Sequence, residues 1–204
     1  MKNNKNKFIY LISPPKINSI FYNDLRKVLK SKKVGFFQLR LKKENFKKKY
    51  AIGKKIKKIC KKFNVKFLIN DDVLLAKKLD ADGCHLGQKD MNIKEARKII
   101  GDKIIGITCH NSIKFAKIAI KNKADYLAFG AFYPSKTKKT RFKATYKILN
   151  EINKITNIPI VAIGGINSNN YKNLLLNKAN FLAISSYIWN NKKYKPIKAI
   201  EKLR

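Results

Sequence analysis

The chain has 204 residues, of which 45% are hydrophobic, and its 48 lysines and arginines against 12 aspartates and glutamates give a formal net charge of +36. This hydrophobic content excludes an intrinsically disordered chain, and no apolar run approaches the roughly 20 residues of a membrane-spanning helix. The first apolar run, FIYLI, is too short for a secretory signal peptide. We therefore expect a soluble, cytoplasmic protein with no membrane partner.

Short apolar segments alternate with helix-periodic segments along the whole chain. Several of the apolar segments lack a polar alternation, which is typical of strands buried on both faces of a parallel sheet. In chain order, the expected strands cover residues 8–13, 36–41, 66–70, 83–87, 104–109, 126–131, 158–164 and 181–186.

The clearest helical pattern covers residues 44–63. Its apolar residues recur every three or four positions and predict one buried stripe, with lysines on the opposite face; they are Phe46, Tyr50, Gly53, Ile56, Cys60 and Phe63. Eight β/α units without an interdomain linker predict an α/β fold, a single (β/α)8 TIM barrel over residues 1–204. An open, doubly wound sheet is the alternative.

Polar side chains follow the expected strands, at the ends that a barrel gathers on one face. Asp71 and Asp90 follow the third and fourth strands. Two carboxylates on adjacent strands suit Mg²⁺, which prefers oxygen ligands. A general acid/base pair and helix N-capping by Asp71 or Asp72 are the alternatives that spacing alone leaves open.

Two groups of residues at these strand ends suit phosphate. Gln38, Arg40 and Lys42 lie two positions apart and point the same way, and with Lys138 they offer fixed positive charge to a diphosphate. Hydroxyls and loop amides after the sixth, seventh and eighth strands predict a second phosphate site. The residues of this second group are Ser135, Lys136, Thr137, Gly164, Gly165, Ser185 and Ser186.

Five segments together resemble the thiamine-phosphate synthase family, in the order that the family has them. They are FQLRLK (37–42), INDDVLLAKKLDADGCHLGQKDM (69–91), GITCHN (106–111), ADYLAFGAFYPSKTKK (124–139) and IPIVAIGGI (158–166). The resemblance implies a TIM barrel that joins hydroxymethylpyrimidine diphosphate to thiazole phosphate and releases pyrophosphate. It also implies a dissociative mechanism assisted by Mg²⁺, which needs no strong protein base.

The resemblance also assigns roles to single residues. It implies Asp71 and Asp90 as the Mg²⁺ ligands, and these two with Arg40 and Lys138 as the catalytic residues. Pyrimidine-diphosphate contacts are expected from Gln38, Leu39, Arg40, Leu41, Lys42, Asn70, Thr108 and Lys138. Thiazole-phosphate contacts are expected from Ser135, Lys136, Thr137, Gly165, Ser185 and Ser186. Where the family commonly has serine after the fifth strand, this chain has Thr108, which keeps the hydroxyl.

Two other functions compete with this one. A thiazole tautomerase of the same fold tends to lack the Asn-Asp pair and relies on a histidine after the fifth strand, where His110 stands here. A basic nucleic-acid-binding protein is the rival from another class. However, only five of the 48 basic residues are arginines, and nucleic-acid readers favour arginine. We therefore expect no specific nucleic-acid partner, while a homo-oligomer stays open.

Overall fold

Eight parallel strands form a closed barrel in the part of the chain that the computed structural model describes, residues 7–134 and 142–203. They run β1 (Ile9–Ile12), β2 (Val34–Leu39), β3 (Lys66–Asn70), β4 (Gly83–Leu86), β5 (Ile104–His110), β6 (Tyr126–Gly130), β7 (Ile160–Ile163) and β8 (Phe181–Ile184). Each strand pairs with the next, and β8 pairs with β1 through the partners Ile9 and Leu182. The predicted barrel is confirmed, and the open sheet is excluded.

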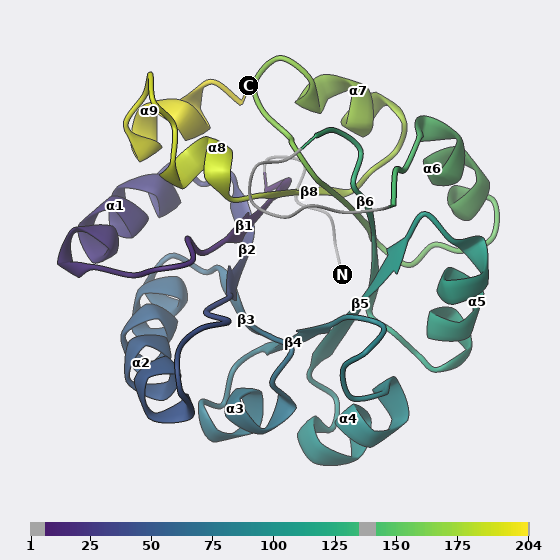
Figure 1. The fold of residues 1–204 in the computed structure, drawn as a ribbon, viewed down its shortest axis with the longest axis horizontal. Helices are drawn as coiled ribbons and strands as arrows, with labels where there is room; N and C mark the ends of the chain where they lie inside the picture. Colours follow the sequence, from purple (N-terminus) through teal and green to yellow (C-terminus); the bar gives the residue numbers. More distant parts are fainter. Residues whose placement is uncertain (1–6, 135–141, 204) are drawn as a thin grey trace.

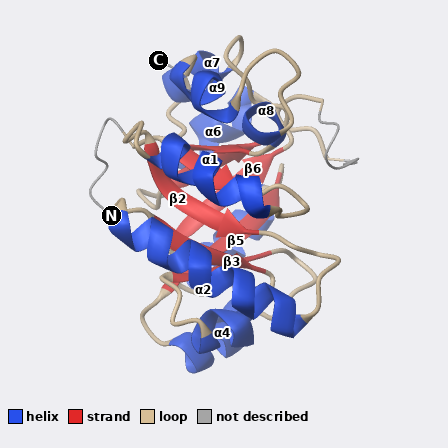
Figure 2. Cartoon of the chain, turned by 90° about the vertical axis from the view of Figure 1, so that its left-hand side faces the viewer, coloured by secondary structure: helices blue, strands red, loops and turns tan. Residues whose placement is uncertain are grey.

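Helices follow the strands and cover the outside of the barrel (Figure 1). They are α1 (Ser19–Leu29), α2 (Phe46–Lys62), α3 (Val73–Lys78), α4 (Ile93–Ile100), α5 (Ile113–Lys121), α6 (Tyr146–Asn153), α7 (Tyr171–Leu176), α8 (Ser186–Trp189) and α9 (Pro196–Glu201). Figure 2 shows α1 and α2 lying across the outer side of the strands. Among the described helices, none is long and apolar enough to cross a membrane.

Two apolar layers hold the barrel together. The larger layer lies between strands and helices, and the smaller one fills the barrel interior with side chains that include Tyr10, Phe36, Leu68 and Tyr126. Alternate residues of each strand supply the two layers, because successive side chains of a strand point to opposite faces. Burial of this apolar area supplies most of the favourable free energy of folding.

The predicted stripe of α2 is partly confirmed. Gly53, Ile56 and Cys60 are buried against the barrel. Phe46, at the first turn, is 42% exposed and lies outside the stripe, whereas the helix also buries Ile52 and Ile59. Phe46 is the first helical residue, directly after the N-cap Asn45, and its ring lies under the Lys78 ammonium, 5.7 Å away, rather than in the core.

Candidate active site

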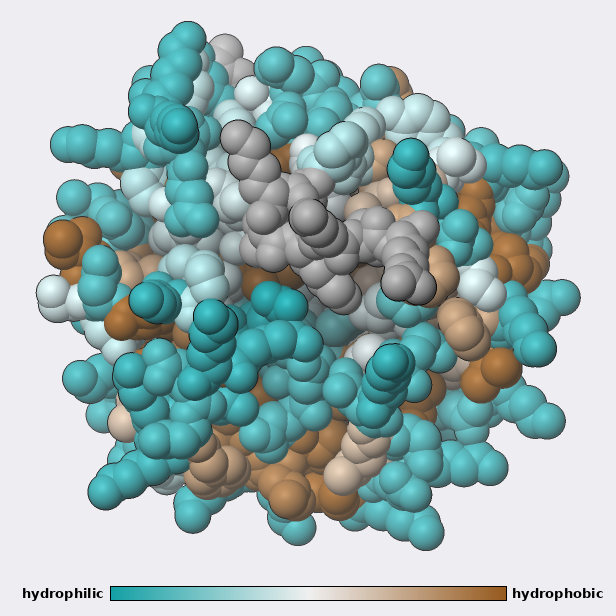
Figure 3. Space-filling view, in the orientation of Figure 1, coloured by the Kyte–Doolittle hydropathy of each residue, from teal (hydrophilic) through white to brown (hydrophobic). Residues whose placement is uncertain are grey.

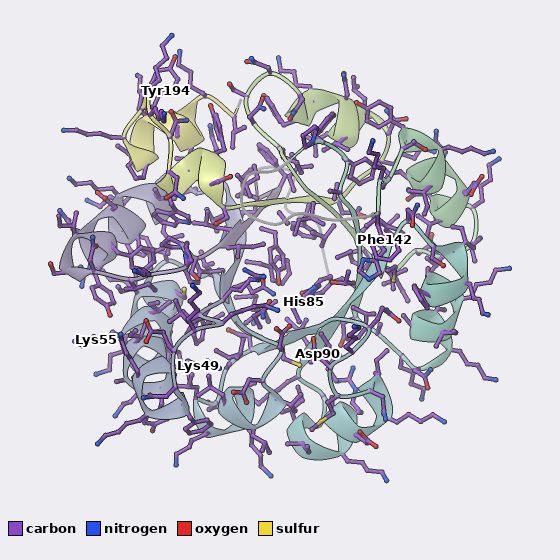
Figure 4. All side chains as sticks on the ribbon, viewed as in Figure 1. Lys49, Lys55, His85, Asp90, Phe142 and Tyr194 are labelled. Carbon is purple, nitrogen blue, oxygen red and sulfur yellow. The ribbon has the colours of Figure 1, made fainter. Side chains whose placement is uncertain are left out.

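The side chains that follow β3 and β4 meet at one end of the barrel. The Asp71 and Asp90 carboxyl groups line the same cavity, and each shifts the pKa of the other. Lys42 Nζ lies 3.1 Å from an Asp71 oxygen, and the Gly87 N–H donates to Asp90 Oδ2 over 2.7 Å. Figure 4 shows Asp90 beside β4, and Lys49 farther out near α2. The structure thus brings together the two acids that the sequence placed on neighbouring strand ends.

Backbone geometry separates the roles of two consecutive aspartates. Asp72 caps α3, since its Oδ1 accepts a hydrogen bond from the Leu75 N–H. Asp71 has a φ of +64°, and its N–H donates to the His85 carbonyl over 2.9 Å. The left-handed turn at Asp71 aims its carboxylate at Asp90. Capping therefore belongs to Asp72, and Asp71 is available for a ligand.

The pKa values of the two acids shift in opposite directions. Burial raises the pKa of Asp90 above its usual value, and the neighbouring Asp71 carboxylate raises it further. Burial also acts to raise the pKa of Asp71, but hydrogen bonds from Asp90 and Lys42 outweigh it, and the pKa is lowered. Two carboxylates this close repel unless a proton or a cation lies between them.

The donor set fits a hard divalent cation. Asp71 and Asp90 would hold a magnesium ion, which would relieve the repulsion between the two carboxylates. Among the described residues, no group of three or more histidine, cysteine, aspartate or glutamate side chains could hold a metal. Mg²⁺ commonly takes one or two carboxylates and completes its shell with waters and substrate phosphates. The pair therefore suits an ion that arrives with a phosphorylated ligand.

Most of the described residues predicted to hold the pyrimidine diphosphate lie on β2 and β3 or directly after β2, and Thr108 lies on β5. Gln38 is 2% exposed, and its amide donates to Asn70 Oδ1 over 3.2 Å. Leu39 and Leu41 alternate with these polar residues, and each is 3% exposed within the outer apolar layer. Any ligand contact from the two leucines would therefore come from their backbone or from a buried apolar surface.

Ser13 is a site residue that sequence reasoning missed. It follows β1, is 3% exposed, and its Oγ accepts a hydrogen bond from the Arg40 N–H over 2.9 Å. Its carbonyl accepts a hydrogen bond from Ser185 Oγ over 3.1 Å. Ser13 therefore joins the predicted diphosphate strand to the predicted thiazole-phosphate turn. A serine at the end of a fully buried apolar run was the only sequence signal for it.

The second predicted phosphate site is described in part. Gly164 and Gly165 have positive φ values of 109° and 61°. A Cβ atom on Gly165 would lie 2.3 Å from the Pro134 carbonyl oxygen, so only glycine lets these two turns pass so closely. Ser185 already donates to Ser13, which leaves its backbone N–H and hydroxyl lone pairs for a ligand. Ser135, Lys136, Thr137 and Lys138 lie outside the described residues.

Thr108 and both histidines also lie at this end of the barrel. Thr108 Oγ1 is 2.8 Å from His85 Nε2, and the Thr108 carbonyl accepts a hydrogen bond from the Gln88 amide. Burial lowers the pKa of His85 from 6.5 to about 4; the nearby Arg40 also lowers it, against the opposing effect of Asp71. His85 is thus neutral at physiological pH.

His110 stacks on Phe142, with ring centroids 4.1 Å apart.

A cavity of about 590 Å³ opens beside the paired aspartates. Lys42, Asn70, Asp71 and Asp90 line its polar side, and Met91 is among the apolar residues opposite. It lies towards α3 rather than over the barrel centre. Hydrophilic side chains are not confined to this area, because Figure 3 shows them projecting around most of the rim of the face in view.

A closed β/α barrel with paired acids, a lysine and glycine-bearing turns at its strand ends is typical of enzymes that act on phosphorylated small molecules. Comparison with known proteins makes this specific. The family model described as thiamine monophosphate synthase matches residues 9–188. The chain therefore belongs to the thiamine-phosphate synthase family, and it is a transferase of thiamine biosynthesis.

Three relatives illustrate the similarity. The thiamine-phosphate synthase of Pelagibacter ubique (strain HTCC1062) is 69% identical over 207 residues, which cover all of both chains. That of Hyphomonas neptunium is 40% identical over 190 residues, covering 90% of this chain and 86% of the relative. The solved structure of thiamine phosphate pyrophosphorylase from Pyrococcus furiosus superposes with a TM-score of 0.86 at 31% identity, covering 99% of this chain and 96% of the other.

Proposed function

We propose that this chain joins 4-amino-2-methyl-5-hydroxymethylpyrimidine diphosphate to 4-methyl-5-(2-hydroxyethyl)thiazole phosphate, giving thiamine phosphate and pyrophosphate. The observation that carries the proposal is that Asp71, Asp90 and Lys42 line one cavity, with the Lys42 ammonium 3.1 Å from an Asp71 oxygen. This arrangement supports the proposal because it would offer cation-binding oxygens and a fixed positive charge to a leaving diphosphate. The proposed site of action is the cytoplasm, and the oligomeric state stays a prediction.

The reaction needs a carbon–oxygen bond to break and a carbon–nitrogen bond to form. The diphosphate leaves with the bonding electron pair, and the thiazole nitrogen then gives its lone pair to the exposed pyrimidine methylene carbon. No proton has to be removed by the protein in either step. Among the described residues, the site accordingly relies on positioning and charge rather than on a nucleophile.

The residues of the chain divide this work. Arg40 and Lys42 hold the diphosphate oxygens, since fixed cations stabilise the charge that develops on them. Gln38 and Asn70, already bonded to each other, orient the pyrimidine at the barrel mouth. Asp71 and Asp90 would hold Mg²⁺, which when bound neutralises charge on the leaving diphosphate. Gly165 and Ser185 would hold the thiazole phosphate through backbone N–H groups.

The direct test mixes the purified protein with both substrates and Mg²⁺ and follows thiamine phosphate and pyrophosphate. Equal amounts of the two products are expected. Isomerisation of a thiazole phosphate without pyrophosphate release would instead indicate the tautomerase activity. A parallel measurement of RNA binding at rising salt tests the alternative of a basic nucleic-acid-binding protein. Affinity that comes from lysine–phosphate contacts falls steeply with salt.

A further inference from the structure

A chain of hydrogen bonds crosses the interior of the barrel and ends at Thr108. The hydroxyl groups of Tyr10 on β1 and Tyr126 on β6 lie 2.7 Å apart. The Tyr126 hydroxyl lies 2.8 Å from His85 Nδ1 on β4, and His85 Nε2 lies 2.8 Å from Thr108 Oγ1 on β5. Four strands thus contribute one member each, and Figure 4 shows His85 within the ring that they form.

Close packing holds the members in place. Tyr10 is 2% exposed and Tyr126 is 1% exposed. The Tyr126 ring stacks on the His85 ring with centroids 5.6 Å apart and an interplanar angle of 16°. A Cβ atom on Gly106 would lie 1.8 Å from Tyr126 Cζ. The Tyr126 ring therefore occupies space that only a glycine at position 106 leaves open.

Counting the hydrogens shows which group donates and which accepts in each of these hydrogen bonds. Among the described residues, the Tyr10 hydroxyl has one hydrogen-bond partner, the Tyr126 hydroxyl. A buried hydroxyl hydrogen is almost always donated, so Tyr10 is the donor to Tyr126. Tyr126 then donates its own hydrogen to His85 Nδ1. That nitrogen must accept, so the imidazole hydrogen is on Nε2 and is donated to Thr108 Oγ1.

The other two arrangements leave a buried hydrogen without an acceptor. If Thr108 donated to His85, every bond would reverse and the Tyr10 hydrogen would have no acceptor among the described residues. If both imidazole nitrogens carried hydrogens, Tyr126 would have to accept from His85 and donate to Tyr10, with the same result. Only the first direction gives every buried donor an acceptor. In that arrangement Thr108 accepts from His85, and its own hydroxyl hydrogen remains available for a ligand.

We propose that Tyr10, Tyr126 and His85 are positioning residues that fix the Thr108 hydroxyl as a hydrogen-bond donor to the pyrimidine substrate. Its partner on that substrate is an acceptor, either a ring nitrogen or a diphosphate oxygen, and not the amino group. The identity of the substrate rests on the proposed function. The direction of the hydrogen-bond chain is a property of the free protein and does not depend on that function.

The first test examines the free protein without substrate. The chain has only two histidines, His85 and His110, so selective ¹⁵N labelling of histidine gives a spectrum with two imidazoles, and His110→Gln assigns them. At neutral pH we expect His85 to show a protonated Nε2 and an unprotonated Nδ1. A proton on Nδ1, alone or with one on Nε2, would overturn the proposal whatever the enzyme catalyses.

The second test uses kinetics to ask whether the tyrosine acts through Thr108. Thr108→Val should raise KM for the pyrimidine diphosphate by about three- to tenfold, the effect of one neutral hydrogen bond, and leave KM for the thiazole phosphate unchanged. Tyr126→Phe should produce a smaller rise of the same kind. The double variant should be no worse than Thr108→Val alone, because coupled residues are not additive.

Matched variants separate this effect from general damage. Thr108→Ser keeps the donor and should restore the wild-type KM, and Tyr194→Phe removes a tyrosine hydroxyl at the periphery (Figure 4) without effect. The proposal would be contradicted if the losses in the double variant were additive, or if Thr108→Ser did not have the wild-type KM. If Tyr126→Phe does not fold, the imidazole spectrum of the wild type and the kinetics of the threonine variants still test the proposal.

The two acceptors can be told apart by fragments of the substrate. Thr108→Val should weaken the binding of hydroxymethylpyrimidine, which has no phosphate, if the acceptor is a ring nitrogen. It should weaken the binding of magnesium pyrophosphate if the acceptor is a phosphate oxygen. Unchanged binding of both fragments would overturn the assignment of a donor role to Thr108.

Discussion

Ser13 Oγ accepts a hydrogen bond from the Arg40 backbone N–H over 2.9 Å. The preceding ladder bond runs from the Ser13 N–H to the Gln38 carbonyl. The serine side chain thus takes the place of a further backbone carbonyl just past the end of β1. It holds the strand of the predicted diphosphate ligands in register beyond the point where regular pairing stops.

Removing this acceptor should weaken binding of the diphosphate substrate. Ser13→Ala leaves the partly buried Arg40 N–H without its partner, which costs about 1–3 kcal/mol, and should raise KM for the pyrimidine diphosphate. KM for the thiazole phosphate should change little, because Ser185 donates to the Ser13 backbone. Steady-state kinetics check this, with Ser168→Ala, whose hydroxyl donates to the neighbouring Asn169, as control. Equal rises in both KM values would contradict a local role.

The neighbouring aspartates offer a matched pair of variants. Asp71→Asn should remove most Mg²⁺-dependent turnover, since it replaces a carboxylate ligand by an amide. Asp72→Asn should keep both turnover and the α3 cap, because asparagine caps helices as well as aspartate does. Turnover at rising Mg²⁺ concentration measures both. Near-normal activity of Asp71→Asn would remove this residue from the proposed metal site.

Asp90→Asn separates metal binding from stability. An asparagine can still donate a hydrogen bond to Asp71 and so imitates the protonated acid, while it lacks the second charge that a cation requires. We expect the free energy of unfolding of the free protein to change by no more than about 0.5 kcal/mol, so that the unfolding temperature stays close to that of the wild type. The rise in unfolding temperature that magnesium pyrophosphate causes in the wild type should disappear. Thermal unfolding with and without the salt measures both, and retained stabilisation would argue against Asp90 as a ligand.

Arg40→Met should discriminate between the two substrates. Methionine keeps much of the apolar side-chain stem and removes the charge, so binding of the pyrimidine diphosphate should fall more than binding of the thiazole phosphate. Arg26→Met on α1 is the control for loss of one positive charge, because Arg26 bonds to the Tyr22 carbonyl on its own helix. Equal weakening of both ligands by Arg40→Met would show that the two sites are misassigned.

The pKa of His85 predicts how stability depends on pH. The pKa is about 4 in the folded chain and 6.5 as the ordinary value, so between these values the unfolded chain binds more protons than the folded one. The free energy of unfolding should therefore fall as the pH drops from about 6.5 to about 4, by at most about 3 kcal/mol.

This value is an upper limit because His85 is partly accessible. Urea unfolding of the wild type and of His85→Gln across this pH range isolates the contribution of the histidine. A wild-type curve parallel to that of the variant would show that His85 does not resist protonation.

Much of the fold was accessible from the sequence alone. The alternation of apolar strands with helical patterns, and the carboxylates and basic residues placed just after the strands, followed from local periodicity and position. These features depend on neighbours along the chain, so a linear reading can find them. The five segments that resemble the family added the reaction, which local chemistry left among several alternatives.

Contacts between distant strands decided the rest. Whether Asp71 or Asp72 caps α3 depends on a left-handed turn at Asp71, held by the His85 carbonyl. The bond between Ser13 and Arg40 joins residues 27 positions apart, and that between Tyr10 and Tyr126 joins residues 116 positions apart. Periodicity carries no information about such pairs, because barrel closure sets which interior side chains meet.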